Sequence, residues 1–152
     1  MRPTPRICLD ANSMISGIAS PNGASGRIVR NIASGRIQLV VSPDIIDEYV
    51  TIGQRPSVIR LFARHGVSVI EYLDVLHELC ATAEVVVPEG DPPACRDEND
   101  RKYLHCAVSA HVDFLVSRDD DLLHLERVES IPILDPGAFL TELRRLNEAL
   151  DP

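Results

Sequence analysis

Acidic residues accompany the short apolar segments of this chain. Asp10 directly follows the apolar run 7–9, Ser42 follows the run 39–41, and Glu48 stands one and a half helical turns beyond Ser42. Two further groups surround a later apolar run, with Asp97, Asn99 and Asp100 ahead of it and Ser117, Asp119, Asp120 and Asp121 behind it. If the apolar runs form a parallel sheet, all four groups gather at one edge, where such sheets bind their ligands.

Carboxylates that share a cleft repel one another, and a divalent cation removes this penalty. Carboxylate oxygens and water suit hard ions such as Mg²⁺ and Mn²⁺, whereas no adjacent Cys/His set is present for zinc. Each acid also has a plainer interpretation. Asp10 and Asp97 could cap helices, Glu48 could be solvated, and Asp119–Asp121 could form an acidic turn. Their joint placement is what indicates a metal site.

The elements that would position these acids alternate along the chain. Apolar runs predict strands at 6–9, 38–41, 85–87, 114–116 and 131–134. Spacing and capping signals predict helices at 26–34, from 43, and at 57–64, 68–82, 100–110, 122–125 and 136–150. Short strands that are apolar on both faces and separated by helices predict an α/β fold, with a central parallel sheet of about five short strands and helices on both faces.

Composition narrows the class of protein. The 152 residues are 45% hydrophobic, as expected of one globular domain spanning 1–152. The net charge of −8 argues against binding nucleic acid through bulk basic charge. The four cysteines form no C-x-x-C pair and are expected to be small core residues. With no apolar run of about 20 residues and no signal peptide, we expect a cytoplasmic protein without a membrane span.

Five pieces of the chain together resemble the PIN domain family, and particularly its branch of toxins from toxin–antitoxin systems. No single piece is specific, but their order and spacing are. The pieces are Leu9–Asn12, Ser42–Glu48, Cys95–Asp100, Leu115–Leu123, and Ile131–Pro136 with Phe139 and Leu140.

The resemblance implies a three-layer PIN-like fold and assigns roles to named residues. The family's four metal acids fall on Asp10, Glu48, Asp100 and Asp119. Polar groups that support them fall on Asn12, Ser42 and Ser117, and Asp97 and Asp121 are further candidates for this supporting role.

The same resemblance implies an endoribonuclease in which Mg²⁺ or Mn²⁺ activates the water that attacks the RNA phosphodiester. The RNA backbone would be held by arginines, for which Arg27, Arg30, Arg96 and Arg118 are candidates, although each can also be an ordinary solvated charge. As partners, the resemblance implies an antitoxin protein and a second copy of the chain in a homodimer. Replacing Asp10 by Asn is expected to abolish cleavage and to stabilise the ion-free protein.

Three alternative functions are compatible with an acid after the first strand. A phosphatase of the haloacid-dehalogenase type needs an acid two positions after Asp10, where this chain has Asn12. A phosphoacceptor receiver domain needs a lysine after a late strand, but the only lysine, Lys102, lies in a predicted helix. A catalytically silent PIN-fold binding module is the third, and the complete set of four acids argues against it.

Overall fold

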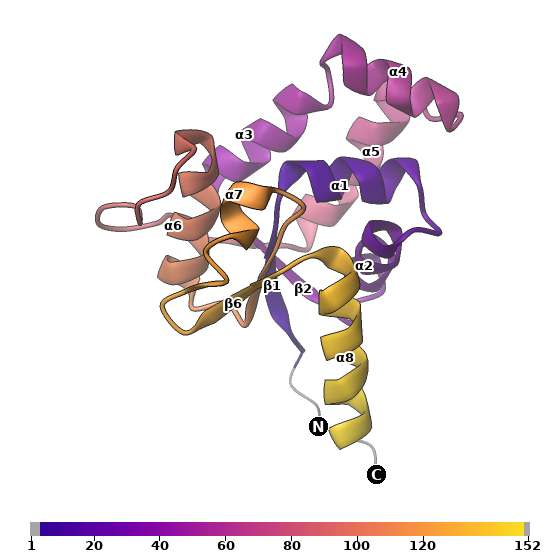
Figure 1. Cartoon of the computed structure of the whole chain (residues 1–152). Coiled ribbons are helices and arrows are strands. Elements are labelled where there is room, and N and C mark those ends of the chain that lie inside the picture. Colours follow the sequence, from indigo (N-terminus) through magenta and orange to yellow (C-terminus); the bar gives the residue numbers. More distant parts are fainter. Residues whose placement is uncertain (1–3, 151–152) are drawn as a thin grey trace.

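In the computed structural model, which describes residues 4–150, a six-stranded sheet lies between helices (Figure 1). The strands are β1 (Arg6–Leu9), β2 (Gln38–Val41), β3 (Glu84–Val85), β4 (Phe114–Val116), β5 (Arg127–Val128) and β6 (Ile131–Leu134). The helices are α1 (Ala11–Ala19), α2 (Ala24–Ala33), α3 (Pro43–Ile52), α4 (Pro56–Arg64), α5 (Val69–Ala81), α6 (Arg101–Ala110), α7 (Asp120–Leu123) and α8 (Pro136–Leu150), with a 3₁₀ turn η1 at Glu98–Asp100.

The sheet has the strand order β3-β2-β1-β4-β6-β5, and every neighbouring pair is parallel except β5 with β6. β1 is central, since Ile7 pairs with Leu39 of β2 and with Phe114 of β4. The carboxyl ends of β1, β2 and β4 therefore lie at the same edge of the sheet. The predicted α/β fold with a central parallel sheet is confirmed.

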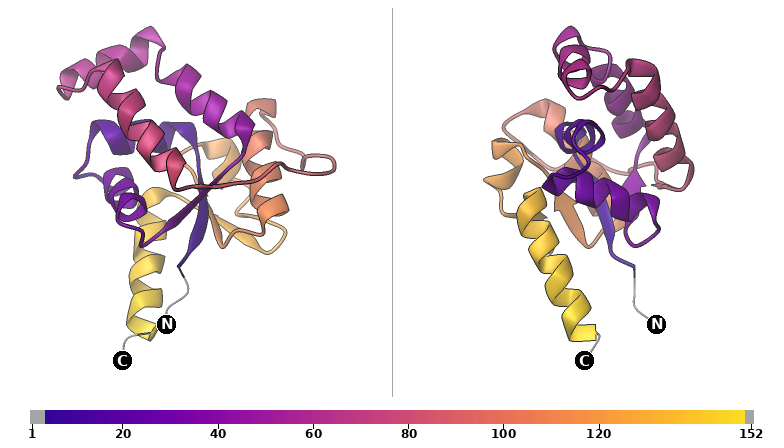
Figure 2. Two further views of the ribbon diagram at one scale, coloured as in Figure 1. Left: turned by 180° about the vertical axis from the view of Figure 1, so that it is seen from behind. Right: turned by 90° about the vertical axis from the view of Figure 1, so that its right-hand side faces the viewer.

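Helices cover both faces of this sheet. α6 contacts β1, β2 and β4 on one face, while α1, α2, α5 and α8 form a connected group on the other (Figures 1 and 2). Ile7, Cys8 and Leu9 of β1 are completely buried between these layers. Among the described residues, no helix has the length and apolar character that crossing a membrane requires.

The sequence did not predict helix α1 or strand β5. α1 begins immediately after β1 and contains Asn12, Ser13 and Gly17, which are weak helix formers, and its mostly buried residues show no simple amphipathic period. It forms because Asp10 caps it and because the helices packed around it, α2, α3, α4 and α5, bury most of its residues. β5 has two residues and pairs antiparallel with β6, too short a signal for periodicity to detect.

Buried tyrosines tie the helices to the central strand. The Tyr72 hydroxyl donates to the backbone oxygen of Tyr49 at 2.7 Å, and the Tyr49 hydroxyl donates to the backbone oxygen of Leu9. Burial raises the pKa of both phenols, so each remains a neutral hydrogen-bond donor. These bonds connect α5 to α3, and α3 to the last residue of β1.

Two glycines allow close contact between the segments of α1 and α2. A Cβ atom on Gly26 would lie 2.4 Å from the backbone of Pro21, and one on Gly17 would lie 2.5 Å from the Val29 Cγ2 atom. The backbone at Gly26 therefore leaves no space for a side chain.

We expect Gly26→Ala to lower the free energy of unfolding by about 1–3 kcal/mol, because the backbone must shift to admit the methyl group. Gly137→Ala is the matched control, since its nearest neighbouring atom lies at an ordinary 3.5 Å. Urea denaturation of both variants measures the difference. Equal stability of the two variants would contradict the prediction.

Candidate metal centre

Asp10 connects the end of β1 to the end of β4. One carboxylate oxygen, Oδ1, accepts the backbone N–H of Ser13 at 3.0 Å and so caps α1. The other, Oδ2, accepts the Ser117 hydroxyl at 2.7 Å and the backbone N–H of Arg118 at 3.0 Å. Asp10 is 4% exposed, so three donors hold a buried carboxylate in one orientation. It is both a helix cap and a member of the group of acids at this edge.

Ser117 links Asp10 to Asp119 through two hydrogen bonds of its hydroxyl group. Its hydroxyl donates to Asp10 and also accepts the backbone N–H of Asp119 at 2.9 Å. Asp119 in turn caps α7, because its Oδ1 accepts the N–H of Asp121 at 2.8 Å. Ser117 thus holds the carboxylate of Asp10 and the backbone of Asp119, two of the predicted metal acids.

Asp100 differs from these residues because part of its carboxylate has no partner. It stands at the junction of η1 and α6, is 8% exposed, and its Oδ2 atom makes no hydrogen bond to any described residue. The pKa of Asp100 is raised to about 7, chiefly by burial and then, in decreasing order, by the charges of Asp119, Asp97, Asp121 and Asp10.

Three acids form the tightest group at this edge. Asp97, Asp100 and Asp121, here called the acid cluster, each present an oxygen within 4.8 Å of the other two. Hard oxygen donors that include an unsatisfied buried atom fit a divalent ion such as Mg²⁺ or Mn²⁺. Asp97 and Asp121 were predicted from the sequence to support the metal acids and not to bind the ion themselves. The Asp97-x-x-Asp100 spacing, one turn of η1, was the available signal that they lie together.

Glu48 reaches this edge from α3 and is held by two successive residues of α6. It accepts the Tyr103 hydroxyl on one oxygen and pairs with Lys102 on the other. The Tyr103 hydroxyl also accepts the backbone N–H of Ala11 at 3.1 Å, which places Glu48 near the start of α1. The contact with Lys102 was not predicted, because no local sequence signal connects this lysine to Glu48, 54 positions earlier.

The polar residues predicted to support the acids have different positions. Asn12 is exposed on α1, and the three hydrogen bonds to Asp10 come from other residues. Ser42 is buried and caps α3, with its hydroxyl accepting the Ile45 N–H at 3.3 Å. Ser13, which the sequence reading did not select, is fully buried beside Asp10, and its hydroxyl has no partner among the described residues.

The four candidate arginines divide into two pairs. Arg96 forms an ion pair with Asp121 at 3.0 Å, and Arg118 stands next to Asp10 in the loop after β4. Arg27 and Arg30 lie on α2, together in a separate hollow that faces α8. Only the first pair adjoins the acids.

Comparison with known proteins agrees with this arrangement. A protein family described as "PIN domain" matches residues 6–121, which include all the acids discussed above. An uncharacterized protein of the archaeon Methanocaldococcus jannaschii is 25% identical over 120 residues, which cover 79% of this chain and 74% of that protein.

We expect Asp100→Asn to stabilise the ion-free protein at pH 8 by on the order of 1 kcal/mol. The pKa of Asp100 is about 7 in the folded chain against 3.8 for an unperturbed Asp, so the folded state holds this proton more tightly. Wild-type stability should therefore fall as pH rises from about 4 to 7, and the variant should lack this component.

Urea denaturation in chelator at pH 5 and pH 8 tests this, with the exposed Asp74→Asn as the control. Loss of stability in Asp100→Asn at pH 8 would contradict the prediction. The contacts of Asp10 change the earlier expectation for Asp10→Asn, because an Asn there cannot accept all three hydrogen bonds equally well. The stabilising substitution is now expected at Asp100.

We also expect Mn²⁺ to raise the melting temperature of the wild type. An ion at 100 times its Kd stabilises the folded state by about 2.7 kcal/mol, which is roughly 5–10 °C for a chain of this size. Asp100→Asn should lose most of this shift and Asp74→Asn should keep it, as measured by differential scanning fluorimetry. Equal shifts in all three proteins would rule out the acid cluster as the binding site.

Proposed function

This chain belongs to the PIN domain family, and on that premise we propose that it is an endoribonuclease dependent on a divalent metal ion. PIN domains are generally nucleases that use such ions. The observation that carries the proposal is the buried Asp100 carboxylate: its Oδ2 atom has no hydrogen-bond partner among the described residues, and Asp97, Asp100 and Asp121 each present an oxygen within 4.8 Å of the other two. Most buried side-chain polar atoms in proteins have at least one hydrogen-bond partner, and a bound ion is one explanation of an exception.

The proposed ligands are the acids at the carboxyl edge of the sheet. Asp10, Glu48, Asp100 and Asp119 keep the ligand role implied by the family resemblance. Asp97 and Asp121 are proposed as additional ligands because each presents an oxygen within 4.8 Å of an Asp100 oxygen. Their oxygen chemistry suits Mg²⁺ or Mn²⁺. When bound, such an ion supplies Lewis-acid activation of water and offsets charge on the phosphodiester.

The residues of the chain itself perform positioning and charge control. Ser117 orients Asp10 and the loop that carries Asp119 through two hydrogen bonds. Tyr103 and Lys102 fix both oxygens of Glu48, so this acid has one position relative to α1. Lys102 and Arg96 also offset two of the negative charges, which limits repulsion of an approaching phosphate.

RNA is the proposed substrate, and cleavage is proposed to leave a 5′-phosphate and a 3′-hydroxyl. Arg96 and Arg118 adjoin the acids and would contact the RNA backbone at the cleavage point. A cytoplasmic location, an antitoxin protein that covers the acidic edge and a homodimeric state are predictions carried over from the resemblance.

A catalytically silent binding module is the alternative, and one observation favours it. Glu48 and Asp121 already have cationic partners inside the chain, so part of the site is balanced without an ion. The phosphatase reading has no such support, because its second acid is replaced by the exposed Asn12.

We expect the wild type to cleave labelled RNA with Mn²⁺ or Mg²⁺ and not with chelator. Removal of a charge that acts on the developing transition state commonly costs 100-fold or more in kcat, and we expect this loss for Asp100→Asn and for Asp10→Asn. Asp74→Asn is the matched control and should cleave as the wild type does. Equal rates for all proteins would indicate a contaminating nuclease and overturn the proposal, and end-labelling of the products reports the 5′-phosphate.

A further inference from the structure

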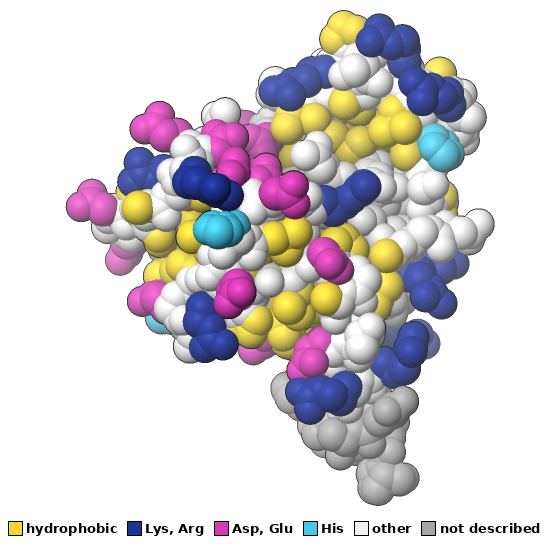
Figure 3. Space-filling model, viewed as in Figure 1, with side chains coloured by type: hydrophobic (Ala, Val, Ile, Leu, Met, Phe, Trp, Pro, Cys, Tyr) yellow, Lys and Arg dark blue, Asp and Glu magenta, His cyan; other side chains and the backbone are white. Residues whose placement is uncertain are grey.

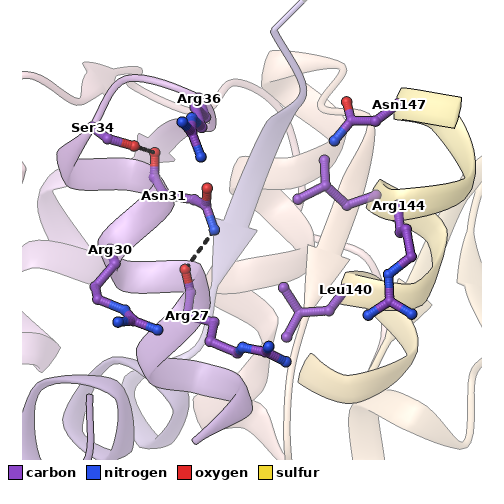
Figure 4. Close-up of a pocket in the computed structure, with 9 residues that line it drawn as sticks. Arg27, Arg30, Asn31, Ser34, Arg36, Leu140, Arg144 and Asn147 are labelled. Atoms are coloured by element: carbon purple, nitrogen blue, oxygen red, sulfur yellow. Dashed lines mark hydrogen bonds between the residues drawn. The ribbon is translucent and has the colours of Figure 1, made fainter. Parts of the chain in front are cut away.

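Four arginines line one hollow on this acidic protein. Arg27 and Arg30 project from α2, Arg36 stands in the turn after it, and Arg144 faces them from α8 across Leu140 (Figure 4). The hollow has a volume of about 550 Å³, within the usual range for ligand sites. No acid is among its described lining residues, although acids outnumber basic residues in the chain by 23 to 15.

The guanidinium groups in this hollow are not used to stabilise the fold. All four arginines are exposed, and within the described part of the chain none of their side chains makes an ion pair or a hydrogen bond. Like charges gathered without partners repel one another, so an anion at this position would be bound favourably. Guanidinium groups match phosphate oxygens in particular, because their planar forks donate two parallel hydrogen bonds.

The residues that line the hollow extend along both helices. Arg27, Arg30 and Asn31 lie on α2 and Ser34 caps its end, and Leu140, Leu143, Arg144 and Asn147 follow one another at helical intervals on α8. Positions 27 and 34 are about 10 Å apart along a helix. A chain of phosphates therefore fits this shape better than a single anion does.

A second hollow lies at the first turns of the same two helices, nearer to the acids. It has a volume of about 400 Å³ and is lined by the first residues of α2 and α8 and by Arg118. Arg118 donates its backbone N–H to Asp10, so this hollow adjoins the acidic edge. Asp135 also lines it and is engaged as the cap of α8, with its Oδ1 2.7 Å from the Ala138 nitrogen.

We propose that the groove between α2 and α8, defined by Arg27, Arg30, Arg36 and Arg144, binds the phosphate backbone of single-stranded RNA and guides it to the acidic edge. This inference rests on the proposed nuclease function and adds to it a substrate site remote from the acids. In Figure 3 acidic side chains gather over α3, α6 and α7, while basic ones lie over α4 as well as over α2 and α8, with further basic groups beside the acids. The groove between α2 and α8 would thus bind a polyanion at a distance from the acids, which repel it.

The test compares two charge-matched double variants by fluorescence anisotropy with a labelled 20-nucleotide RNA in EDTA, so that no cleavage occurs. Arg30→Gln with Arg144→Gln should weaken binding about tenfold and lower the slope of log affinity against log salt by about 1.4, since each phosphate contact to a single strand contributes about 0.7. Arg60→Gln with Arg64→Gln removes two exposed charges from α4 and should keep the wild-type slope. Single-stranded DNA of the same sequence should behave in the same way, because the contact is to phosphate.

Equal slopes for the two double variants, or no RNA binding by the wild type in EDTA, would overturn the proposed groove. Competition by polyglutamate as strong as by unlabelled RNA would also overturn it, by identifying an acidic protein segment as the occupant. Cleavage with Mn²⁺ is measured separately. Binding with the expected slopes and no cleavage would refute only the nuclease function, whereas cleavage with equal slopes would refute only the groove.

Discussion

Hydrogen bonds to the Asp10 carboxylate hold together the edge of the sheet on which the other acids depend. They join the end of β1, the first turn of α1 and the loop after β4, and Ser117 extends them to Asp119. Because β1 lies between β2 and β4, this one carboxylate sets the spacing of segments that are more than 100 residues apart in sequence. The remaining acids are positioned relative to it.

The same edge carries more negative charge than the chain itself offsets. Lys102 and Arg96 each pair with one acid, whereas the Oδ2 atom of Asp100 stays buried without a partner among the described residues. Such an arrangement makes folding less favourable when no ion is bound, and it links ion binding to stability. The raised pKa of Asp100 and the suitability of its surroundings for a cation thus have one physical origin, the crowding of carboxylates in a buried place.

Local sequence signals predicted most of the strands and helices. They failed for features that depend on contacts between residues distant in the sequence. Apolar runs located β1, β2, β4 and β6, and Ser42 with Pro43 correctly indicated the start of α3. They missed α1, whose helix depends on burial, and they could not show that Lys102 would meet Glu48, 54 positions earlier.

The acids were predicted as one group because parallel strands end at one edge, but the sequence could not rank them by proximity. It also could not show that Arg144, near the end of the chain, faces Arg27 and Arg30, since that depends on how α8 packs against α2.

The first turn of α6 has a mechanical consequence. Asp100 precedes α6 as its N-cap, and Lys102 and Tyr103 lie in its first turn, so the regular geometry of one helix end fixes their relative positions. A tilt or a shift of α6 would therefore displace the Asp100 carboxylate together with Lys102 and Tyr103, which hold Glu48. The positions of Asp100 and Glu48 are therefore coupled through α6. A substitution at the buried Leu104 or Cys106 would shift both acids without contacting either of them.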